Sequence, residues 1–165
     1  MVVIRSALLG LVTLLLTTAP RPAQADEVPF SFGPEAGWQL LGGLTTGVGF
    51  GDPDLGGYVG GELSLNRLNE SLWFGLYGDA LYDFGPDSTM LTVGPQLGYS
   101  VLGIDGGLAA RHGDGEWLLG PQGRVLLSLG FFSLYGRLAL FDDDGDDIQV
   151  WQVGMLLKMP LWASE

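Results

Sequence analysis

The chain has 165 residues, enough for one domain, with 19 acidic and 7 basic residues, a net charge of −12 and no cysteine. This acidity argues against nucleic acid as a partner, because phosphates are bound by Lys and Arg. The absence of cysteine excludes disulfides, thiolate catalysis and a lipid-modified N-terminal cysteine.

Residues 1–25 have the three parts of a secretory signal peptide. Arg5 supplies the positive start, residues 7–19 the apolar core, and Ala23-Gln24-Ala25 the cleavage site. A membrane anchor is disfavoured, because the apolar run is shorter than the ~20 residues that a spanning helix needs. We therefore predict export and one domain over residues 26–165, with the net charge changing from −12 to −14 when Arg5 and Arg21 are removed.

From Trp38 onward, apolar and polar residues alternate with period two, which is the pattern of a β-strand with two unlike faces. Turn signals divide the pattern into eight predicted strands: residues 37–49, 58–66, 71–83, 90–101, 104–112, 117–128, 131–141 and 148–161. Most run to ~9–13 residues, the length that crosses a bilayer when tilted, against ~5–6 in soluble sheets. The sequence thus predicts an all-β barrel or sandwich.

The clearest unit is the hairpin over residues 90–112. A two-residue turn at Leu102-Gly103 would pair Val101 with Ile104 and keep both on one face. Residues 94–111 and 120–137 repeat this unit, since both begin Gly-Pro-Gln and end in Arg. The proline in each repeat removes a ladder hydrogen bond, so we expect bulges or kinks there.

Every ionisable side chain within the predicted strands lies on the face opposite the apolar series. The set comprises Glu62, Asp79, Asp83, Asp105, Arg111, Arg124, Arg137 and Lys158. In a soluble barrel or sandwich these charges would face water; in a membrane barrel they would pair inside the lumen while the apolar face meets lipid. Balanced signs favour the closed interior, and the scarcity of Lys and Glu on the polar face also favours the membrane.

Aromatic residues gather toward both ends of the apolar face, as interfacial girdles do at the two bilayer surfaces. One predicted girdle comprises Phe50, Tyr82, Phe84, Trp117 and Trp151, and the other Trp38, Phe74, Tyr99 and Phe132. The connections also alternate. Acidic, slightly longer ones (residues 51–57, 84–89, 112–116 and 142–147) alternate with mostly very short ones (67–70, 102–103 and 129–130). This predicts external loops at one end and periplasmic turns at the other.

These features together resemble the small eight-stranded outer-membrane barrels of Gram-negative bacteria, the group around outer membrane proteins A, X and W. In such proteins the last strand carries an assembly signal, which Gln152, Gly154, Leu157 and Met159 match here. Aliphatic residues replace the usual aromatics, and the chain ends Trp162-Ala163-Ser164-Glu165 where a terminal Phe is usual. The resemblance implies insertion by the outer-membrane barrel assembly machinery.

Two further groups of residues are candidates for chemistry. Some barrels of this kind are lipid A deacylases with a His, Ser and acidic triad, but His112 has no suitably placed Ser, and Ser128 falls at the opposite membrane surface. We therefore expect no catalytic site. The carboxylates of Asp142, Asp143, Asp144, Asp146 and Asp147 form a weak Ca²⁺ candidate. A solvated acidic loop is the simpler expectation, because the closing Glu of the twelve-residue calcium loop is missing.

The prediction is therefore an eight-stranded antiparallel up-and-down transmembrane β-barrel after a cleaved signal peptide, located in the outer membrane. An interior of this size is just wide enough for side chains to fill, so the eight charges are expected to form a packed salt-bridge network rather than line a channel. We expect a structural or surface-interaction role, a monomer in outer-membrane lipid, and no cofactor. The alternatives are a soluble lipocalin-like barrel with an apolar ligand and, less favoured, a lipid A-modifying enzyme.

Overall fold

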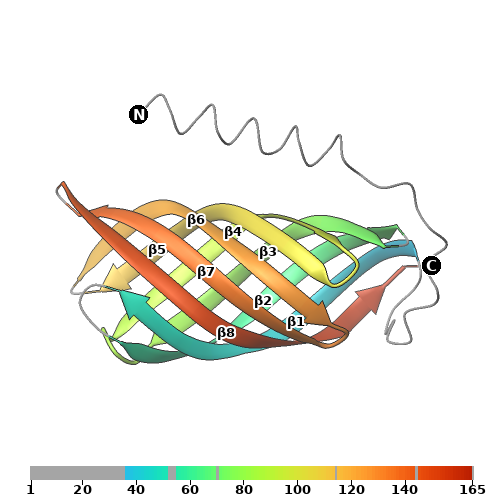
Figure 1. The fold of residues 1–165 in the computed structure, drawn as a ribbon, viewed down its shortest axis with the longest axis horizontal. Coiled ribbons are helices and arrows are strands. Elements are labelled where there is room, and N and C mark those ends of the chain that lie inside the picture. Colours follow the sequence, from blue (N-terminus) through green and yellow to red (C-terminus); the bar gives the residue numbers. More distant parts are fainter. Residues whose placement is uncertain (1–35, 52–54, 70, 114, 144, 165) are drawn as a thin grey trace.

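The computed structural model describes residues 36–51, 55–69, 71–113, 115–143 and 145–164, so the expected signal peptide lies outside the described residues. Eight antiparallel strands form a closed barrel in chain order, with β1 pairing to β8 (Figure 1). The strands are β1 Ala36–Gly51, β2 Gly56–Asn69, β3 Leu72–Asp83, β4 Ser88–Tyr99, β5 Leu102–Gly113, β6 Glu116–Leu129, β7 Phe132–Asp143 and β8 Asp146–Ala163. The predicted up-and-down topology is confirmed. Among the described residues, no helix is long and apolar enough to span a membrane.

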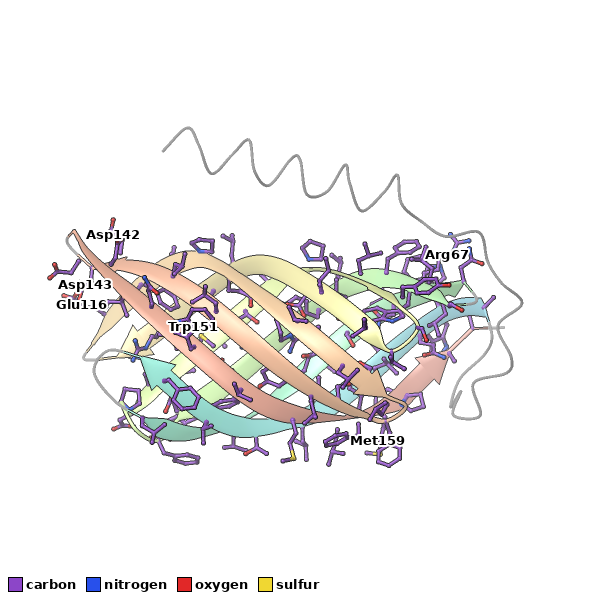
Figure 2. The ribbon with its side chains drawn as sticks, in the orientation of Figure 1. Arg67, Glu116, Asp142, Asp143, Trp151 and Met159 are labelled. Carbon is purple, nitrogen blue, oxygen red and sulfur yellow. The ribbon has the colours of Figure 1, made fainter. Side chains whose placement is uncertain are left out.

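The barrel has two distinct ends. We call the end that holds the start of β1 and the finish of β8 the termini end, and it also carries the connections at residues 70–71, 100–101 and 130–131. The loop end carries the connections at residues 52–55, 84–87, 114–115 and 144–145. Figure 2 shows Glu116, Asp142 and Asp143 at the loop end and Arg67 at the termini end.

Burial alternates residue by residue along the strands, because successive side chains point to opposite faces. The predicted apolar series faces outward: Leu108 is 65 % exposed and Leu119 72 %. The predicted charges face inward, and Arg124 and Arg137 are both 2 % exposed. The division of the strands into two faces therefore agrees with the sequence pattern.

The predicted turns are displaced along the chain. In the hairpin of β4 and β5, Tyr99 pairs with Leu102 and Leu97 with Ile104, so the turn is Ser100-Val101, not Leu102-Gly103. The displacement is two residues, and this preserves which residues share a face. Ser100 takes a positive φ of 52°, so backbone geometry rather than residue preference fixes this turn.

Bulges or kinks were predicted at Pro95 and Pro121, and the described ladders show no register shift of a bulge at either proline. The β4–β5 ladder has no residue pairs at residues 94–95, but its register is the same on either side of them. The β6–β7 ladder stops at Gln122↔Ala139, next to Pro121. Each proline removes an N–H, which interrupts pairing on one side of its strand. The register shift in the described ladders lies instead between Leu40 and Leu41 of β1, where Leu41 pairs with Pro160 of β8.

The acidic connections are shorter than predicted. β5 continues to Gly113 and β6 begins at Glu116, while β7 continues to Asp143 and β8 begins at Asp146. The carboxylates of the last hairpin therefore lie mostly on strands, with Asp142 paired opposite Asp147 and Asp143 opposite Asp146. In Figure 1 the tip of this hairpin, coloured orange to red, projects at the loop end of the barrel.

Candidate functional site: the charged lumen

Arg124 of β6 lies at the centre of the lumen and reaches three carboxylates on three other strands. Its Nη1 is 2.6 Å from Glu62 Oε2 of β2 and 3.7 Å from Asp79 Oδ2 of β3, and its Nε is 2.6 Å from Asp105 Oδ2 of β5. The four side chains are at most 1 % exposed. The short distances to Glu62 and Asp105 are those of charge-assisted hydrogen bonds.

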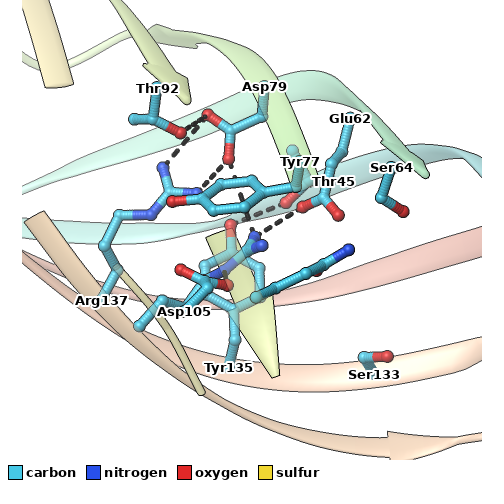
Figure 3. A network of polar contacts seen from close by, with 12 residues as sticks. Thr45, Glu62, Ser64, Tyr77, Asp79, Thr92, Asp105, Ser133, Tyr135 and Arg137 are labelled. Carbon is cyan, nitrogen blue, oxygen red and sulfur yellow. Dashed lines mark hydrogen bonds and ion pairs between the residues drawn. The ribbon is translucent and has the colours of Figure 1, made fainter. Parts of the chain in front are cut away.

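Two more cations complete the network. Arg137 of β7 binds Asp79 through Nη2, with Nη1 3.4 Å from the other carboxylate oxygen (Figure 3). Lys158 of β8 lies 2.5 Å from Glu62 Oε1 and 3.3 Å from the hydroxyl of Ser64. The carboxylates of Glu62, Asp79 and Asp105 are thus matched in number by the charges of Arg124, Arg137 and Lys158. This formal neutrality is what a desolvated charge cluster requires.

Tyrosine rings pack against the guanidinium groups. The carbon at the centre of the Arg124 guanidinium lies 4.6 Å from the ring centroid of Tyr77 and 5.2 Å from that of Tyr135. The Nη2 of Arg124 is buried without a hydrogen bond, so these aromatic faces supply a favourable environment for it. Tyr135 is held by the hydroxyl of Thr45 at 2.7 Å, and Tyr77 accepts a hydrogen bond from the Gln122 amide.

Buried neutral amides and hydroxyls extend the network. Thr92 donates to Asp79 at 2.7 Å, Gln96 donates to Asn66 at 2.5 Å, and Gln152 accepts from Arg137 at 3.4 Å. The alternation in the sequence is consistent with the inward position of these residues, but of them only Gln152 was predicted to belong to a site, the assembly signal. The spacing of these residues in the sequence does not predict their contacts. The alternation shows which face a residue occupies, but not which strands bring their residues together in the lumen.

Apolar side chains fill the lumen around the charges. Between the network and the loop end, Leu81, Met90, Phe141 and Val150 are at most 8 % exposed and form part of one cluster with partly buried Leu118 and Ile148. On the other side of the network, Leu126 and Leu156 are at most 1 % exposed. The described lumen is therefore a packed core in which apolar side chains surround the charges, and it also holds buried polar side chains toward the termini end: Gln39, Ser64, Asn66 and Ser133.

The structure does not bring all eight predicted charges together. Asp83 lies near the loop end, where its carboxylate accepts the N–H of Gly85 at 3.1 Å. Arg111 is also nearer that end, and its Nε donates to the hydroxyl of Ser88 at 3.3 Å. Within the described residues neither forms an ion pair. The common face was predictable, but the heights of these two residues in the barrel were not.

The remaining candidates have separate surroundings. His112 packs against Trp117, with 4.8 Å between ring centroids, and Asp114 lies outside the described residues. Asp142 accepts the N–H of Gly145 at 2.9 Å, and Asp144 also lies outside the described residues. In the described part of the chain, no three His, Asp or Glu side chains are grouped closely enough to hold a metal ion.

The residues that match the assembly signal divide between the two faces. Gln152 is buried inside, and Gly154 lies inside beside Tyr58 and Tyr135. A Cβ on Gly154 would meet Thr46 O at 2.7 Å and Tyr135 Cζ at 3.0 Å, so the tyrosines occupy the space of a side chain. Leu157 and Met159 face outward, 47 % and 69 % exposed, and Figure 2 labels Met159 on the outer surface.

The aromatic residues predicted for the girdles lie on the outer face. All but Phe132, which is partly buried, are between 39 % and 62 % exposed. Arg67, which the sequence analysis placed in a turn, lies on β2 and also faces outward, 6.0 Å from the ring centroid of Trp38. Arg67 lies near the end of its strand and against an aromatic ring. From such a position a long cationic side chain can reach the interface of a membrane.

The closed topology, the outward apolar face and the inward charges define the class of small eight-stranded outer-membrane-type barrels. Among solved structures, the fold is similar to Neisserial surface protein A, with a TM-score of 0.53 and 9 % identity over 74 % of this chain and 96 % of that one. The attachment invasion locus protein Ail of Yersinia pestis, solved with the heparin analogue sucrose octasulfate, aligns with a TM-score of 0.42 and 14 % identity over 76 % of this chain and 100 % of that one. No protein-family model and no curated protein matches the sequence.

Proposed function

We propose that the protein spans the bacterial outer membrane as a small closed β-barrel with a structural or surface-interaction role. The observation that carries this proposal is the distribution of polarity across the barrel wall. The ion pairs of the lumen are buried, whereas Leu44, Leu108 and Leu119 on the outside are at least 65 % exposed. Soluble monomers rarely expose continuous apolar patches beyond a few hundred Å², and lipid is the solvent that this surface fits.

The lumen supports a scaffold that does not conduct. The neutral network of Arg124 and its partners and the buried side chains packed around it occupy the interior. An eight-stranded barrel has no spare width once its side chains are packed. We infer that ions and solutes do not pass through it.

The proposed orientation of the barrel in the membrane rests on the difference between its termini end and its loop end. With the termini end in the periplasm, the connections at residues 70–71, 100–101 and 130–131 lie on the periplasmic side, and the carboxylates of Glu116, Asp142, Asp143, Asp146 and Asp147 lie on the outer side. We propose that the chain is exported by residues 1–25 and inserted by the barrel assembly machinery, with Gln152, Gly154, Leu157 and Met159 as its signal. Its partner in the membrane would then be outer-membrane lipid, with the barrel as a monomer and the acidic rim facing the medium.

The two alternatives receive less support. A lipocalin-like barrel would need an apolar cavity inside, but the described lumen is occupied at its centre by buried ion pairs. A lipid-modifying enzyme would need a nucleophile beside His112, whose ring instead packs on Trp117. Ser128 bonds to Ser133 at 2.9 Å near the termini end, far along its strand from His112.

Two measurements test the proposal. On an SDS gel of the outer-membrane fraction, the unboiled protein is expected to migrate differently from the boiled one, because a closed barrel resists the detergent. In planar bilayers, the purified protein is expected to show no stable single-channel conductance. A protein found in the soluble fraction with no heat-dependent mobility contradicts the membrane assignment, while a large stable pore contradicts only the closed lumen.

A further inference from the structure

A shallow groove crosses the outer wall of the barrel over β1, β2 and β3. Outward-facing residues with little or no side chain form its floor: Gly42 on β1, Gly61 on β2, and Gly78 and Ala80 on β3. Gly61 lies opposite Ala80. Leu63 of β2 lies opposite Gly42 on one side and Gly78 on the other, so the small residues adjoin one another. Together they leave a groove of about 370 Å³ in a wall that otherwise carries large apolar side chains.

The floor of the groove is paired backbone. Glu62 and Asp79 also line it, but their side chains are only 1 % exposed and form ion pairs with Arg124, Arg137 and Lys158 in the lumen. The strands beneath the groove pair continuously with their neighbours, so their amides and carbonyls are hydrogen-bonded across the ladders. A hydrocarbon chain can therefore lie against this floor without burying an unsatisfied polar group.

A cation lies on the same wall as the groove. Among the described residues, Arg67 is the only Arg or Lys whose side chain faces outward, and it belongs to β2, the central strand of the groove. In this part of the chain it forms no ion pair, and its guanidinium carbon lies 6.0 Å from the ring centroid of Trp38. Figure 2 shows Arg67 at the termini end. A phosphate at the membrane interface would find an unpaired partner there.

The separation of the cation and the groove suits one lipid molecule. Arg67 and Leu63 are four residues apart on β2, which corresponds to about 13 Å along a strand. One leaflet contributes about 15 Å to the hydrocarbon thickness of a bilayer. An acyl chain whose headgroup lies at Arg67 therefore reaches the groove.

We propose that Arg67, Trp38 and this groove bind one glycerophospholipid, with Arg67 holding the phosphate and an acyl chain lying in the groove. A guanidinium binds phosphate through charge-assisted, often bidentate hydrogen bonds. Trp38 suits the level between headgroup and chain, because its ring is apolar and its indole N–H is polar. The inference rests on the proposed function for the bilayer, and the proposed orientation makes this the periplasmic leaflet.

The charges of the barrel disfavour two other occupants. A lipid of the opposite leaflet would bring its phosphate to the loop end, where Glu116, Asp142 and Asp143 are exposed. A second copy of this chain would insert in the same direction, so the acidic rims of the two copies would lie at the same height and repel each other. A lipid whose phosphate lies at the termini end avoids both repulsions.

The first test measures binding to the full chain folded in detergent micelles, by native mass spectrometry. The probes are phosphatidylglycerol, diacylglycerol with the same chains, and glycerol 3-phosphate, which has the phosphate without the chains. We expect one phosphatidylglycerol per barrel and at least about tenfold weaker binding of diacylglycerol, because hydrogen bonds to a charged group are lost. Glycerol 3-phosphate should not bind measurably. Equal binding of phosphatidylglycerol and diacylglycerol would overturn the proposal, as would binding of glycerol 3-phosphate as strong as that of the lipid.

Variants separate the headgroup from the chain. Arg67→Gln should weaken phosphatidylglycerol to the level of diacylglycerol and leave diacylglycerol unchanged, while Arg67→Lys, which keeps the charge, should retain most of the affinity. Gly78→Leu fills the groove and should weaken both lipids several-fold; its Cβ meets Thr92 O at an ordinary 3.5 Å, so the wall accepts it. Gly136→Leu, on β7 outside the groove, is the matched control, since a Cβ there meets no atom within 4 Å. Equal effects of the two leucine variants would overturn the proposal.

The second test locates the lipid in vesicles. Phosphatidylglycerol with a diazirine in the middle of one chain is irradiated, and the labelled peptides are identified. We expect labels concentrated on the groove residues of β1, β2 and β3; even labelling of all walls would overturn the lipid site and leave the outer-membrane assignment intact. A protein recovered in the soluble fraction would overturn both. A dimer that Gly78→Leu abolishes would assign the groove to a second copy, against this proposal. Each variant is first checked for heat-dependent gel mobility, so that loss of folding is not taken for loss of binding.

Discussion

The guanidinium of Arg124 on β6 contacts the carboxylate of Glu62 on β2 at 2.6 Å, so one ion pair ties opposite walls of the barrel together. Arg124 also holds Asp105 at 2.6 Å, and Glu62 also holds Lys158 at 2.5 Å. The pair is therefore the bridge between the two halves of the network. Among the described residues, removing Arg124 leaves Asp105 without an ion-pair partner, and removing Glu62 leaves Lys158 without one.

Replacing Arg124 with Met is expected to lower the free energy of unfolding by about 3–5 kcal/mol, because Glu62 and Asp105 then lose their main buried partner. The measurement is urea unfolding in lipid vesicles, followed by gel mobility. Arg67→Met is the matched control, since Arg67 is exposed and contacts an aromatic ring; its expected loss is below about 1 kcal/mol. Equal losses for the two variants would show that the ion pairs contribute no special stability.

Gly154→Ala is expected to destabilise the barrel by about 1–3 kcal/mol, because the new methyl group overpacks the space beside Tyr58 and Tyr135. Gly136→Ala provides the comparison, since a Cβ there meets no atom within 4 Å. The Gly136 variant should be neutral or more stable by up to about 1 kcal/mol through the unfolded state. Unfolding curves that rank the two variants in the opposite order would contradict the described packing.

Leu108→Lys tests the outer face. Leu108 lies in the middle of β5 and is 65 % exposed, so in a bilayer its replacement by Lys should cost about 2–4 kcal/mol. Leu55→Lys, on the 52–55 connection at 69 % exposure, should cost little because it can reach water. The folded yield in vesicles gives the comparison. If Leu108→Lys folded as well as Leu55→Lys, the middle of β5 would not be in hydrocarbon.

Ser164→Ala is expected to loosen the closure of the barrel between β1 and β8. The Ser164 hydroxyl accepts the N–H of Trp38 at 3.0 Å, and the Ser164 N–H donates to the Trp38 carbonyl at 2.9 Å. Loss of the hydroxyl should cost about 0.5–1.5 kcal/mol. Hydrogen exchange should accelerate at the Trp38 amide and stay unchanged at Thr45 in the middle of β1. Unchanged exchange at Trp38 would mean that the hydroxyl does not protect this amide.

The faces of the strands were predictable from the sequence because the period of two depends on burial alone. The turn of the β4–β5 hairpin lies two residues from its predicted position, yet Leu97 and Ile104 still share a face. The prediction of which side chains share a face was therefore unaffected. The ends of strands were less predictable. The runs of Asp and Gly that suggested loops at residues 112–116 and 142–147 continue the ladders instead, since strand pairing overrides local preference.

Membership of the network was only partly predictable. Alternation shows that Asp83 and Arg111 share a face with Arg124, but their contacts depend on stagger between strands, which alternation does not determine. Tyr77 and Tyr135 illustrate the opposite case. They are apolar enough to suit either face, and their role beside the guanidinium groups appears only when β3, β6 and β7 are brought around one lumen.

The ion pairs also constrain the order of events in folding. Glu62 and Arg124 are 62 residues apart in the chain, and Asp79 and Arg137 are 58 apart. An open sheet that has not yet curled round leaves such partners separated, and in hydrocarbon each separated charge carries a large energetic penalty. In the proposed outer-membrane barrel, we therefore expect curling and insertion into the bilayer to proceed together, because these charges find their partners only when the first and last strands come close.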